Sequence, residues 1–550
     1  MRDNWTGAKK TIVFLPIDAH GHTSPMLSLA AELRAFGYRT IFITYSSDIA
    51  KHYGHETVLL DECTLKIKQA SNGLASKSLS TGVTEQDIYL NAKLFDHDWD
   101  EKRLVFNAEL ADGAFIDEIS FRTAQTNFSL WPRMAEKALK TDKMLERVLI
   151  ALQPQLVVTE LTPMRPALVR LSREPYAKLI AGWSQPLRWM TLVSLGPTWI
   201  HYCGHLTRAA DVEELQPQPP PHFGFPVKRR LNNEDYKVQN DLFKQLITSS
   251  GFLQSQVDLG RAALLSNIED KPLTDSQIGS LLLNESSWLN VYMYPSELDY
   301  DTDYKSNLDR SRWVRVDALV RPTSLCSSDS EHLINRLVSW QQSKRENRSL
   351  KVIYIALGTV VSEDMSIMES VISQVLKCLE EQPEWRIAMA LGTRHVEISR
   401  RFQEQFNFWQ DRRSQLIVRG WWPQPEVFRR QLVDACVIHG GNNTFCEIFY
   451  FARPPPALVM IPGQGDQLDN ARRVQEFDLG VVLPVAKMLR RTPSSDSKGN
   501  LLLDAMKQSL KLHRASGSKV TIDWTHPRLN AEYCAKLVHE KLEKENHALG

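Results

Sequence analysis

The amino-acid sequence predicts an α/β protein with two domains, and three observations support this prediction. Short apolar runs rich in β-branched residues alternate with helical patterns over about the first 300 residues, which is typical of a parallel sheet covered by helices. The same alternation starts again at Lys351. The chain of 550 residues is also longer than a single hydrophobic core usually serves, so two cores are expected.

The first half opens with a predicted strand and a predicted helix. The run TIVFLP (11–16) is apolar on both faces, as in a strand buried within a parallel sheet. A helix should follow, with Ser24 as its N-cap, Pro25 in its first position and Gly37 at its end. Further strands are predicted for residues 38–45, 154–160, 262–268 and 289–295.

The second half repeats the pattern, with strands predicted for residues 351–359, 385–392, 416–424 and 434–441. Residues 321–332 are polar and rich in turn formers, so we place the domain boundary there. The proline-rich segment 215–226 should form a surface loop, because it can sustain neither helix nor sheet. The predicted division is an N-terminal domain (1–320), a linker (321–350), a C-terminal domain (351–525) and a charged amphipathic C-terminal helix (526–550).

Composition narrows the class of protein. The formal net charge is +1 and no long basic block occurs, so neither nucleic acid nor an anionic membrane is an expected partner. Seven scattered cysteines without a C-x-x-C pair favour a reducing compartment. We find no signal-peptide core and no apolar run of the roughly 18 residues that a membrane span requires, so a cytoplasmic location is expected.

A group of polar residues follows the strand at 434–441. The His-Gly-Gly turn of 439–441 leads into a predicted helix, whose first amides and positive dipole end would favour an anion such as a phosphate. Asn443 and Glu447 lie one turn apart on the same helix face, with Thr444 beside them. Because a carboxylate accepts hydrogen bonds but repels phosphate, Glu447 should meet hydroxyl groups, such as those of a ribose.

Residues on either side of this group could contact other parts of the same ligand. Trp421 follows a predicted strand and could stack on a flat heterocycle, while Gln424 could bond to its edge. Asp466 and Gln467 supply polar groups suited to the hydroxyls of a hexose. The order of residue types therefore matches base, ribose, diphosphate and sugar.

The segment that carries these groups resembles the signature of the UDP-glycosyltransferase family. Residues 420–471 contain W-x-P-Q, then H-x-G-x-N-T with a glutamate eight residues after the histidine, then D-Q-x-x-N-A. HGHTSPMLSLAAEL (20–33) resembles the first loop and helix of the family, and IYIALGT (353–359) resembles the strand that opens its second domain. The resemblance implies the GT-B fold, in which two Rossmann-like domains face each other across a cleft and a C-terminal helix packs back on the N-terminal domain.

The resemblance also implies a role for each donor-site residue. A UDP-sugar would be the donor, a small hydrophobic molecule would be the acceptor, and no metal or other cofactor would be needed. For the nucleoside, Trp421 would stack on uracil, Gln424 would lie near the base or ribose, and Glu447 would hold the ribose. The diphosphate would be bound by His439, Gly441, Thr444 and Thr359, with Asn443 near phosphate and sugar. The sugar hydroxyls would contact Asp466 and Gln467.

Transfer to an alcohol needs a base, since a neutral hydroxyl is a poor nucleophile, and histidine suits this task near neutral pH. The family pattern places the base three residues before the proline of AHGHTSP, which selects His22 over His20. A carboxylate should orient the ring, and the matching position is Glu160, where the family usually has aspartate. The expected reaction is a single displacement with inversion.

Other interpretations stay open at this stage. Taken alone, His22 could be a loop histidine, Glu160 a strand-end charge and Trp421 part of the core. The aromatic stretch 183–202 could line an acceptor pocket or be plain core. A metal-dependent glycosyltransferase using Asp301 and Asp303 (with Asp299) and a catalytically impaired nucleotide-sugar-binding protein are the two rival functions. A nicotinamide oxidoreductase is disfavoured because no G-x-G-x-x-G follows a strand.

Overall fold

The computed structural model describes most of the chain. The described residues are 10–17, 20–44, 56–59, 66–68, 124, 128–161, 163–208, 219–225, 233–264, 273–300, 308–320, 328–362, 364–412, 414–489, 500–516 and 526–549. Within them, no helix is both long enough and apolar enough to cross a membrane.

The N-terminal half contains an eight-stranded sheet in the order β4-β3-β2-β1-β5-β6-β7-β8. Neighbouring strands run parallel except β3 and β4, which pair antiparallel. The strands are β1 (Thr11–Leu15), β2 (Arg39–Thr44), β3 (Glu56–Leu59), β4 (Lys66–Lys68), β5 (Leu156–Glu160), β6 (Trp189–Val193), β7 (Leu289–Met293) and β8 (Trp313–Val316). Every residue of β5, β6 and β7 is buried, as expected for central strands that are covered on both faces.

The helices of this half pack on the sheet and on each other. They are α1 (His20–Ala35), α5 (Leu130–Leu152), α6 (Pro166–Leu171), α7 (Glu174–Tyr176), α8 (Pro197–Arg208), α9 (Asn233–Ser249), α10 (Phe252–Ala262) and α11 (Asp275–Leu283), with short turns η1 (Ala177–Ala181) and η2 (Ser296–Leu298).

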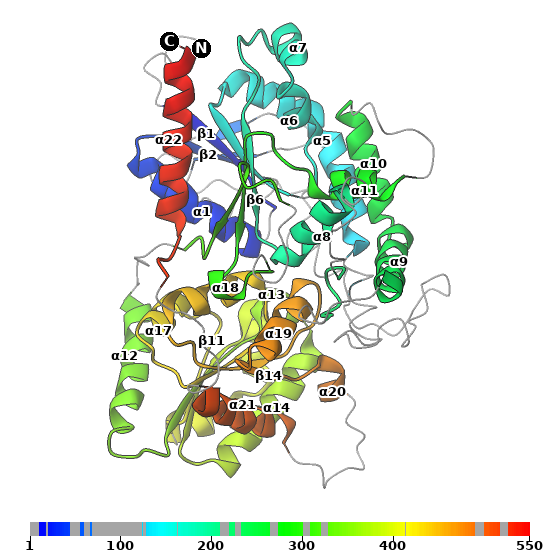
Figure 1. The fold of residues 1–550 in the computed structure, drawn as a ribbon. Helices are drawn as coiled ribbons and strands as arrows, with labels where there is room; N and C mark the ends of the chain where they lie inside the picture. The colour runs from blue at the N-terminus through cyan, green and yellow to red at the C-terminus, as the bar shows by residue number, and fades with distance from the viewer. Residues whose placement is uncertain are drawn as a thin grey trace.

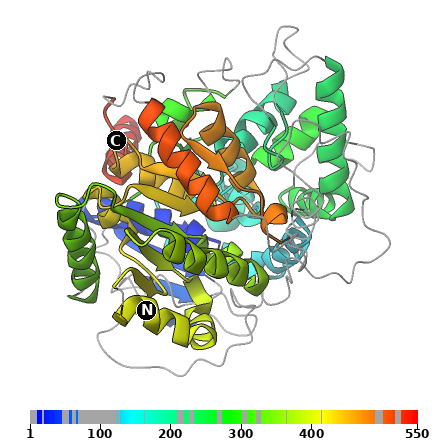
Figure 2. The ribbon, with the colours of Figure 1, turned by 90° about the horizontal axis from the view of Figure 1, so that it is seen from below.

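The C-terminal half contains a six-stranded parallel sheet in the order β11-β10-β9-β12-β13-β14. The strands are β9 (Lys351–Ala356), β10 (Trp385–Ala390), β11 (Leu416–Arg419), β12 (Ala435–Ile438), β13 (Ala457–Met460) and β14 (Gly480–Val482). The helices and helical turns are α12 (Ser328–Ser343), α13 (Gly358–Val361), α14 (Met365–Glu381), η4 (Gly392–Arg394), α15 (His395–Arg401), α16 (Gln403–Asn407), η5 (Phe408–Arg412), α17 (Gln424–Arg429), α18 (Asn442–Phe451), α19 (Asp466–Glu476), α20 (Val485–Leu489) and α21 (Leu501–Ser516). Helices α14 and α21 cover one face of this sheet, and α17, α18 and α19 cover the other (Figures 1 and 2).

Strand order places one switch point in each sheet. In the N-terminal half the chain leaves β1 in one direction through β2 and returns on its other side through β5, so the switch point lies at the ends of β1 and β5. In the C-terminal half the same reversal occurs between β9 and β12. Open α/β sheets bind ligands at such points, and Figure 1 shows α18 and α19, which follow strands of the second sheet, at the level where the two halves meet.

The C-terminal helix α22 (Ala531–Leu549) packs on the N-terminal half beside α1 (Figure 1). The phenol of Tyr38 lies 3.0 Å from Nδ1 of His539, and the ring of Phe36 stacks on the same imidazole. Trp288 donates its indole N–H to Glu545 at 2.9 Å. The predicted return of this helix to the first half is therefore confirmed.

Helix α19 joins the two halves through a buried carboxylate. Asp469 accepts hydrogen bonds from the hydroxyl of Thr198 at 2.7 Å and from the backbone N–H groups of His222 and Gly224 at 2.8 and 3.0 Å. Thr198, His222 and Gly224 all belong to the N-terminal half. Because burial outweighs these bonds, the pKa of Asp469 is raised to about 6.

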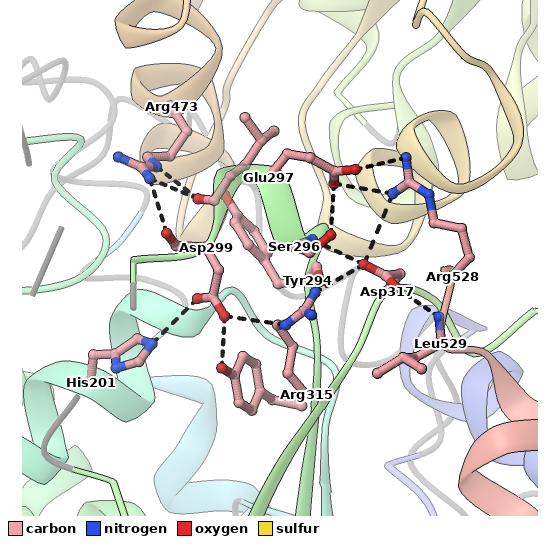
Figure 3. A network of polar contacts seen from close by, with 12 residues as sticks. His201, Tyr294, Ser296, Glu297, Asp299, Arg315, Asp317, Arg473, Arg528 and Leu529 are labelled. Atoms are coloured by element: carbon pink, nitrogen blue, oxygen red, sulfur yellow. Dashed lines mark hydrogen bonds and ion pairs between the residues drawn. The ribbon is translucent and has the colours of Figure 1, made fainter. Parts of the chain in front are cut away.

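A second junction brings α19 together with the segment that precedes α22 (Figure 3). Arg473 is fully buried and donates to the carbonyl oxygen of Leu298 from both Nε and Nη2, at 2.9 and 2.8 Å. Arg528 pairs with Glu297 at 3.2 Å and lies 3.9 Å from Asp317. The residues that follow β7 and β8 thus contact two segments that are distant in sequence, namely α19 and the segment before α22.

Three sequence predictions about the N-terminal half were wrong. Helix α1 begins at His20, not after Ser24, so Pro25 lies inside the helix. Residues 262–264 end α10 and form a turn instead of a strand, and residues 265–268 lie outside the described part. Residues 219–225 are irregular as predicted, yet they are buried because Phe223 and its neighbours pack in the core between α8 and α19.

Candidate functional site

Three polar side chains meet at the switch point of the first sheet. His22 lies in the first turn of α1, Glu160 ends β5, and Ser194 directly follows β6. Nδ1 of His22 lies 2.7 Å from Oγ of Ser194 and 3.3 Å from Oε1 of Glu160. Ser194 in turn donates to Oε1 of Glu160 at 2.9 Å. The structure therefore brings the two predicted catalytic residues together and adds a hydroxyl between them.

Ser194 is the residue that the sequence analysis missed. The strand β6 lies inside the aromatic stretch 183–202, for which pocket or core was left open. The signal that could have found it is the run MTLVS, an apolar segment that ends in a polar residue, like LVVTE at Glu160. Carboxyl ends of neighbouring parallel strands lie at one edge, so both residues were candidates for the same crevice.

The His439 turn lies at the switch point of the second sheet. Gly440 has φ +92, which favours glycine, and a Cβ there would lie 2.8 Å from Cε of Met460. The imidazole of His439 occupies the space beside Gly358 and Gly441, where an added Cβ would approach Nε2 to 2.3 Å in each case. Burial lowers the pKa of His439 to about 4, against the opposing effect of a hydrogen bond to the backbone of Ala356, so its ring is neutral at pH 7 and has a single N–H.

Helix α18 begins next to this ring without a side-chain cap, because its N-cap residue is Gly441. Amides of an uncapped first turn, with the positive end of the helix dipole, favour an anionic ligand. This is the arrangement that the sequence predicted for a phosphate.

The second residue of α18 reaches the other half of the molecule. Asn443 donates from Nδ2 to the carbonyl oxygen of Gly21 at 2.6 Å. Inside a helix that carbonyl would accept the N–H four residues later, but residue 25 is proline and has none. The carbonyl of Gly21 therefore has no helical donor, and Asn443 donates to it from the other half.

Gln424, Thr444 and Glu447 form one hydrogen-bonded group. Gln424, at the start of α17, donates from Nε2 to Oε2 of Glu447 at 2.6 Å and to Oγ1 of Thr444 at 3.2 Å. Its Oε1 accepts the phenol O–H of Tyr354 at 3.1 Å, which orients the amide. Burial raises the pKa of Glu447 to about 7, while the bond from Gln424 acts in the opposite direction.

The two adjacent tryptophans have different environments. Trp421 is 52% exposed, whereas Trp422 is buried and donates its indole N–H to the carbonyl of Met389 at 3.1 Å. Of the two indoles, that of Trp421 is therefore the one exposed to solvent.

The two predicted sugar-contacting residues start α19. Asp466 accepts the backbone N–H of Gly196 at 3.2 Å, so it faces the N-terminal half. Burial and the charge of Asp469 raise the pKa of Asp466 to about 7, and the attraction of His22 opposes this rise. Gln467 is buried, and its Oε1 accepts the backbone N–H groups of Gly463 and Gln464 in the preceding loop, at 3.0 and 3.3 Å.

Some predicted positions lie outside the described structure. Thr359 belongs to α13, but its side chain is not described. Asp301 and Asp303 of the metal-dependent alternative also lie outside the described residues. Asp299 is buried and accepts a hydrogen bond from the phenol of Tyr292 at 2.8 Å (Figure 3). Across the described ranges, no cluster of three or more histidine, cysteine, aspartate or glutamate side chains could hold a metal ion.

Comparisons with known proteins match part of the sequence and the fold of the chain. A family model described as UDP-glucoronosyl and UDP-glucosyl transferase matches residues 340–496. Human UDP-glucuronosyltransferase 1A9 is 26% identical over 137 residues, which is 25% of this chain and 22% of that protein. The chain thus matches only about a fifth of the length of this curated relative.

Two solved structures have a similar fold over nearly the whole chain. The glycotransferase of kitacinnamycin aligns with a TM-score of 0.50 and 15% identity, covering 97% of this chain and 99% of the other. The glycosyltransferase VinC in complex with DTDP aligns with a TM-score of 0.52 and 11% identity, covering 97% and 100%. At these identities the likeness shows the fold alone.

Two facing α/β halves, each with a switch point at the junction, define a two-domain protein of the GT-B glycosyltransferase fold, as the sequence predicted. The family match includes the His439 turn and both flanking helices, so this part of the chain is similar to UDP-glucoronosyl and UDP-glucosyl transferases.

Proposed function

We propose that the protein transfers a hexose from a UDP-sugar to a hydroxyl group of a small lipophilic acceptor, with inversion and with His22 as general base. One observation carries this proposal: Asn443, in the first turn of the uncapped helix α18, bonds to the backbone carbonyl of Gly21, the neighbour of His22. A diphosphate held at the start of α18 would therefore place its attached sugar close to His22.

The donor would lie along the second sheet in the order that the sequence suggests. The uracil would stack on the indole of Trp421, which is half exposed, and the ribose hydroxyls would donate to Glu447. His439, Gly441, Thr444 and the backbone at Thr359 would hold the diphosphate. Asp466 and Gln467 would meet the sugar hydroxyls, Asp466 on the side of the cleft that faces His22.

The reaction would be a single displacement. Nε2 of His22 takes the proton of the acceptor hydroxyl while the oxygen forms a bond to the anomeric carbon. The bond from that carbon to the diphosphate oxygen breaks, and UDP leaves with the electron pair. Amides of α18 stabilise the leaving charge, and closure of the two halves supplies the orientation of the reactants. These steps need no metal ion. We also propose that residues 321–350 form the linker between the N-terminal and C-terminal domains.

A donor-by-acceptor screen tests this function. UDP-glucose and UDP-glucuronate are each tested with a panel of hydrophobic alcohols and phenols, and at least one donor should give a product that has gained the mass of its glucosyl or glucuronosyl group by mass spectrometry. His22→Ala should lower kcat/KM about 10²- to 10⁴-fold, because the base is lost, while the affinity for UDP stays within about twofold.

The same assay separates the rival functions. Activity that is abolished by excess chelator would favour the metal-dependent alternative at Asp301 and Asp303. UDP binding without turnover of any donor would favour a nucleotide-sugar-binding protein. Equal activity of the wild type and His22→Ala would remove His22 from the mechanism.

A further inference from the structure

The ring of His22 contacts both Ser194 and Glu160, and the two contacts differ in length. Ser194 is buried, with an exposed fraction of 6%, and Glu160 is buried with 4%. The hydroxyl oxygen of Ser194 lies closer to the imidazole nitrogen, at 2.7 Å, than the carboxylate oxygen does, at 3.3 Å. The shorter contact of the ring is thus made by serine.

Counting hydrogens decides which nitrogen of His22 is protonated. A hydroxyl has one hydrogen, and a carboxylate has none. Between Oγ of Ser194 and a carboxylate oxygen of Glu160 only the hydroxyl can donate, so the single hydrogen of Ser194 is assigned to this 2.9 Å contact and Oγ accepts from the ring. Nδ1 of His22 must then carry a hydrogen, which leaves the lone pair on Nε2.

The other tautomer, in which Nδ1 of His22 is unprotonated, is disfavoured by the same distances. If Ser194 donated to an unprotonated Nδ1, its oxygen would face Oε1 of Glu160 at 2.9 Å without a hydrogen between them. The lone pair of Nδ1 would also face that oxygen at 3.3 Å. Both contacts would be repulsive in a buried place, where unmatched polar groups are costly.

From this geometry we propose that Ser194 is a positioning residue that holds His22 in the Nδ1-protonated tautomer and links its ring to Glu160. The catalytic part of the proposal rests on the proposed function, whereas the tautomer does not. When Nε2 takes the acceptor proton, the Nδ1–H bond to Ser194 persists, and Glu160 stabilises the imidazolium through the hydroxyl. Ser194 thereby connects Glu160 to the ring, because the direct distance between Nδ1 of His22 and Oε1 of Glu160 is 3.3 Å.

The tautomer is measured on the free protein by ¹⁵N NMR of histidine-labelled chain, with the His22 signals assigned by their loss in His22→Gln. In the wild type at about pH 8, Nδ1 should have the shift of a protonated nitrogen and Nε2 that of an unprotonated one. In Ser194→Ala the population should move towards the Nε2-protonated form. Ser28→Ala is the control, because its hydroxyl lies on the same helix and bonds only to the backbone carbonyl of Ser24.

Turnover gives the second readout, with UDP-glucose or UDP-glucuronate and the best acceptor of the screen. Ser194→Ala should lower kcat about 10- to 100-fold, as loss of a ligand-orienting partner does elsewhere, with UDP affinity within about twofold of the wild type. Ser194→Thr keeps the hydroxyl and should restore at least about a third of kcat. A merely structural role would lower the melting temperature and the UDP affinity without changing the tautomer.

Each result bears on a different claim. An unchanged His22 tautomer in a folded Ser194→Ala variant, or a kcat within about twofold of the wild type, would overturn the role of Ser194. Absence of turnover in the wild type, together with the expected change of tautomer, would overturn the proposed function and leave the positioning of the ring by Ser194 intact.

Discussion

At the scale of single residues, the candidate donor site holds two carboxyl groups that burial makes hard to ionise. The pKa of Glu447 and that of Asp466 are each raised to about 7. Glu447 is oriented by Gln424, which is itself held by the phenol of Tyr354. A ribose hydroxyl that donates to Glu447 would stabilise its charged form, so binding of UDP should lower this pKa.

The pH dependence of stability tests the environment of Glu447. Its pKa is about 7 when folded and 4.5 in the reference state, so the folded chain binds more protons between these values and stability falls as the pH rises through them. Glu447→Gln removes this loss. Between about pH 5 and pH 8 the wild type should lose on the order of 2 kcal/mol more than this variant in urea unfolding.

A matched control is Glu381→Gln, an exposed residue of α14. This variant should follow the wild type at every pH. Parallel stability curves for the wild type and Glu447→Gln would show that Glu447 titrates as an ordinary carboxyl group.

At the scale of elements, contacts between distant segments explain which predictions succeeded. The strands at residues 11–16, 154–160 and 434–441 could be predicted, because buried parallel strands are apolar on both faces and end at polar residues. Ser24 and Pro25 resemble a helix start, yet α1 begins at His20, five residues before Pro25. Sequence periodicity cannot reveal that the Gly21 carbonyl, which Pro25 leaves without a helical donor, is taken by Asn443 from the other half.

The same limit applies to the candidate site. The donor-site order from Trp421 to Gln467 lies within one continuous stretch, so its spacing was readable from the chain. Ser194 joins His22 and Glu160 only because β1, β5 and β6 are neighbours in the sheet. Gln467 was expected at the sugar, but part of its amide is used by the loop before α19. Strand order and local loop bonds are set by tertiary packing, which spacing does not encode.

The contact between Asn443 and Gly21 makes a prediction about α1 and α18. Asn443→Ala should destabilise the ligand-free protein by about 1 kcal/mol, because the carbonyl of Gly21 loses its donor. In the background of Pro25→Ala, a helical N–H becomes available to that carbonyl, so the same substitution should cost little. A double-mutant cycle in urea measures this coupling. Strictly additive effects would mean that Pro25 and Asn443 do not share the carbonyl.

At the scale of the whole molecule, helix α19 and the segment before α22 hold the two halves together. Asp469 and Arg473 are both buried and both bond to the N-terminal half. The rings of Tyr294 and Phe445, one from each half, also stack with centroids 5.5 Å apart. The halves therefore share buried polar and apolar contacts at the junction where the candidate site lies.

Replacement of Arg473 tests the strength of this junction. Arg473→Met keeps most of the volume but leaves the carbonyl of Leu298 without its donor, so we expect a loss of about 3 kcal/mol. Thermal unfolding should change from one transition towards two, as the halves separate before they melt. Lys511→Met, on an exposed position of α21, should melt like the wild type. An unchanged transition in Arg473→Met would contradict a structural role for this junction.

The central claim is that the second half holds a UDP-sugar at the start of α18 while the first half presents His22 to it. Isothermal titration calorimetry of UDP tests this claim most directly, with the wild type, Glu447→Ala and His22→Ala compared under one condition. The wild type should bind UDP, Glu447→Ala should bind at least about tenfold more weakly because ribose contacts are lost, and His22→Ala should bind like the wild type. Absence of UDP binding by the folded wild type at millimolar concentration would contradict it.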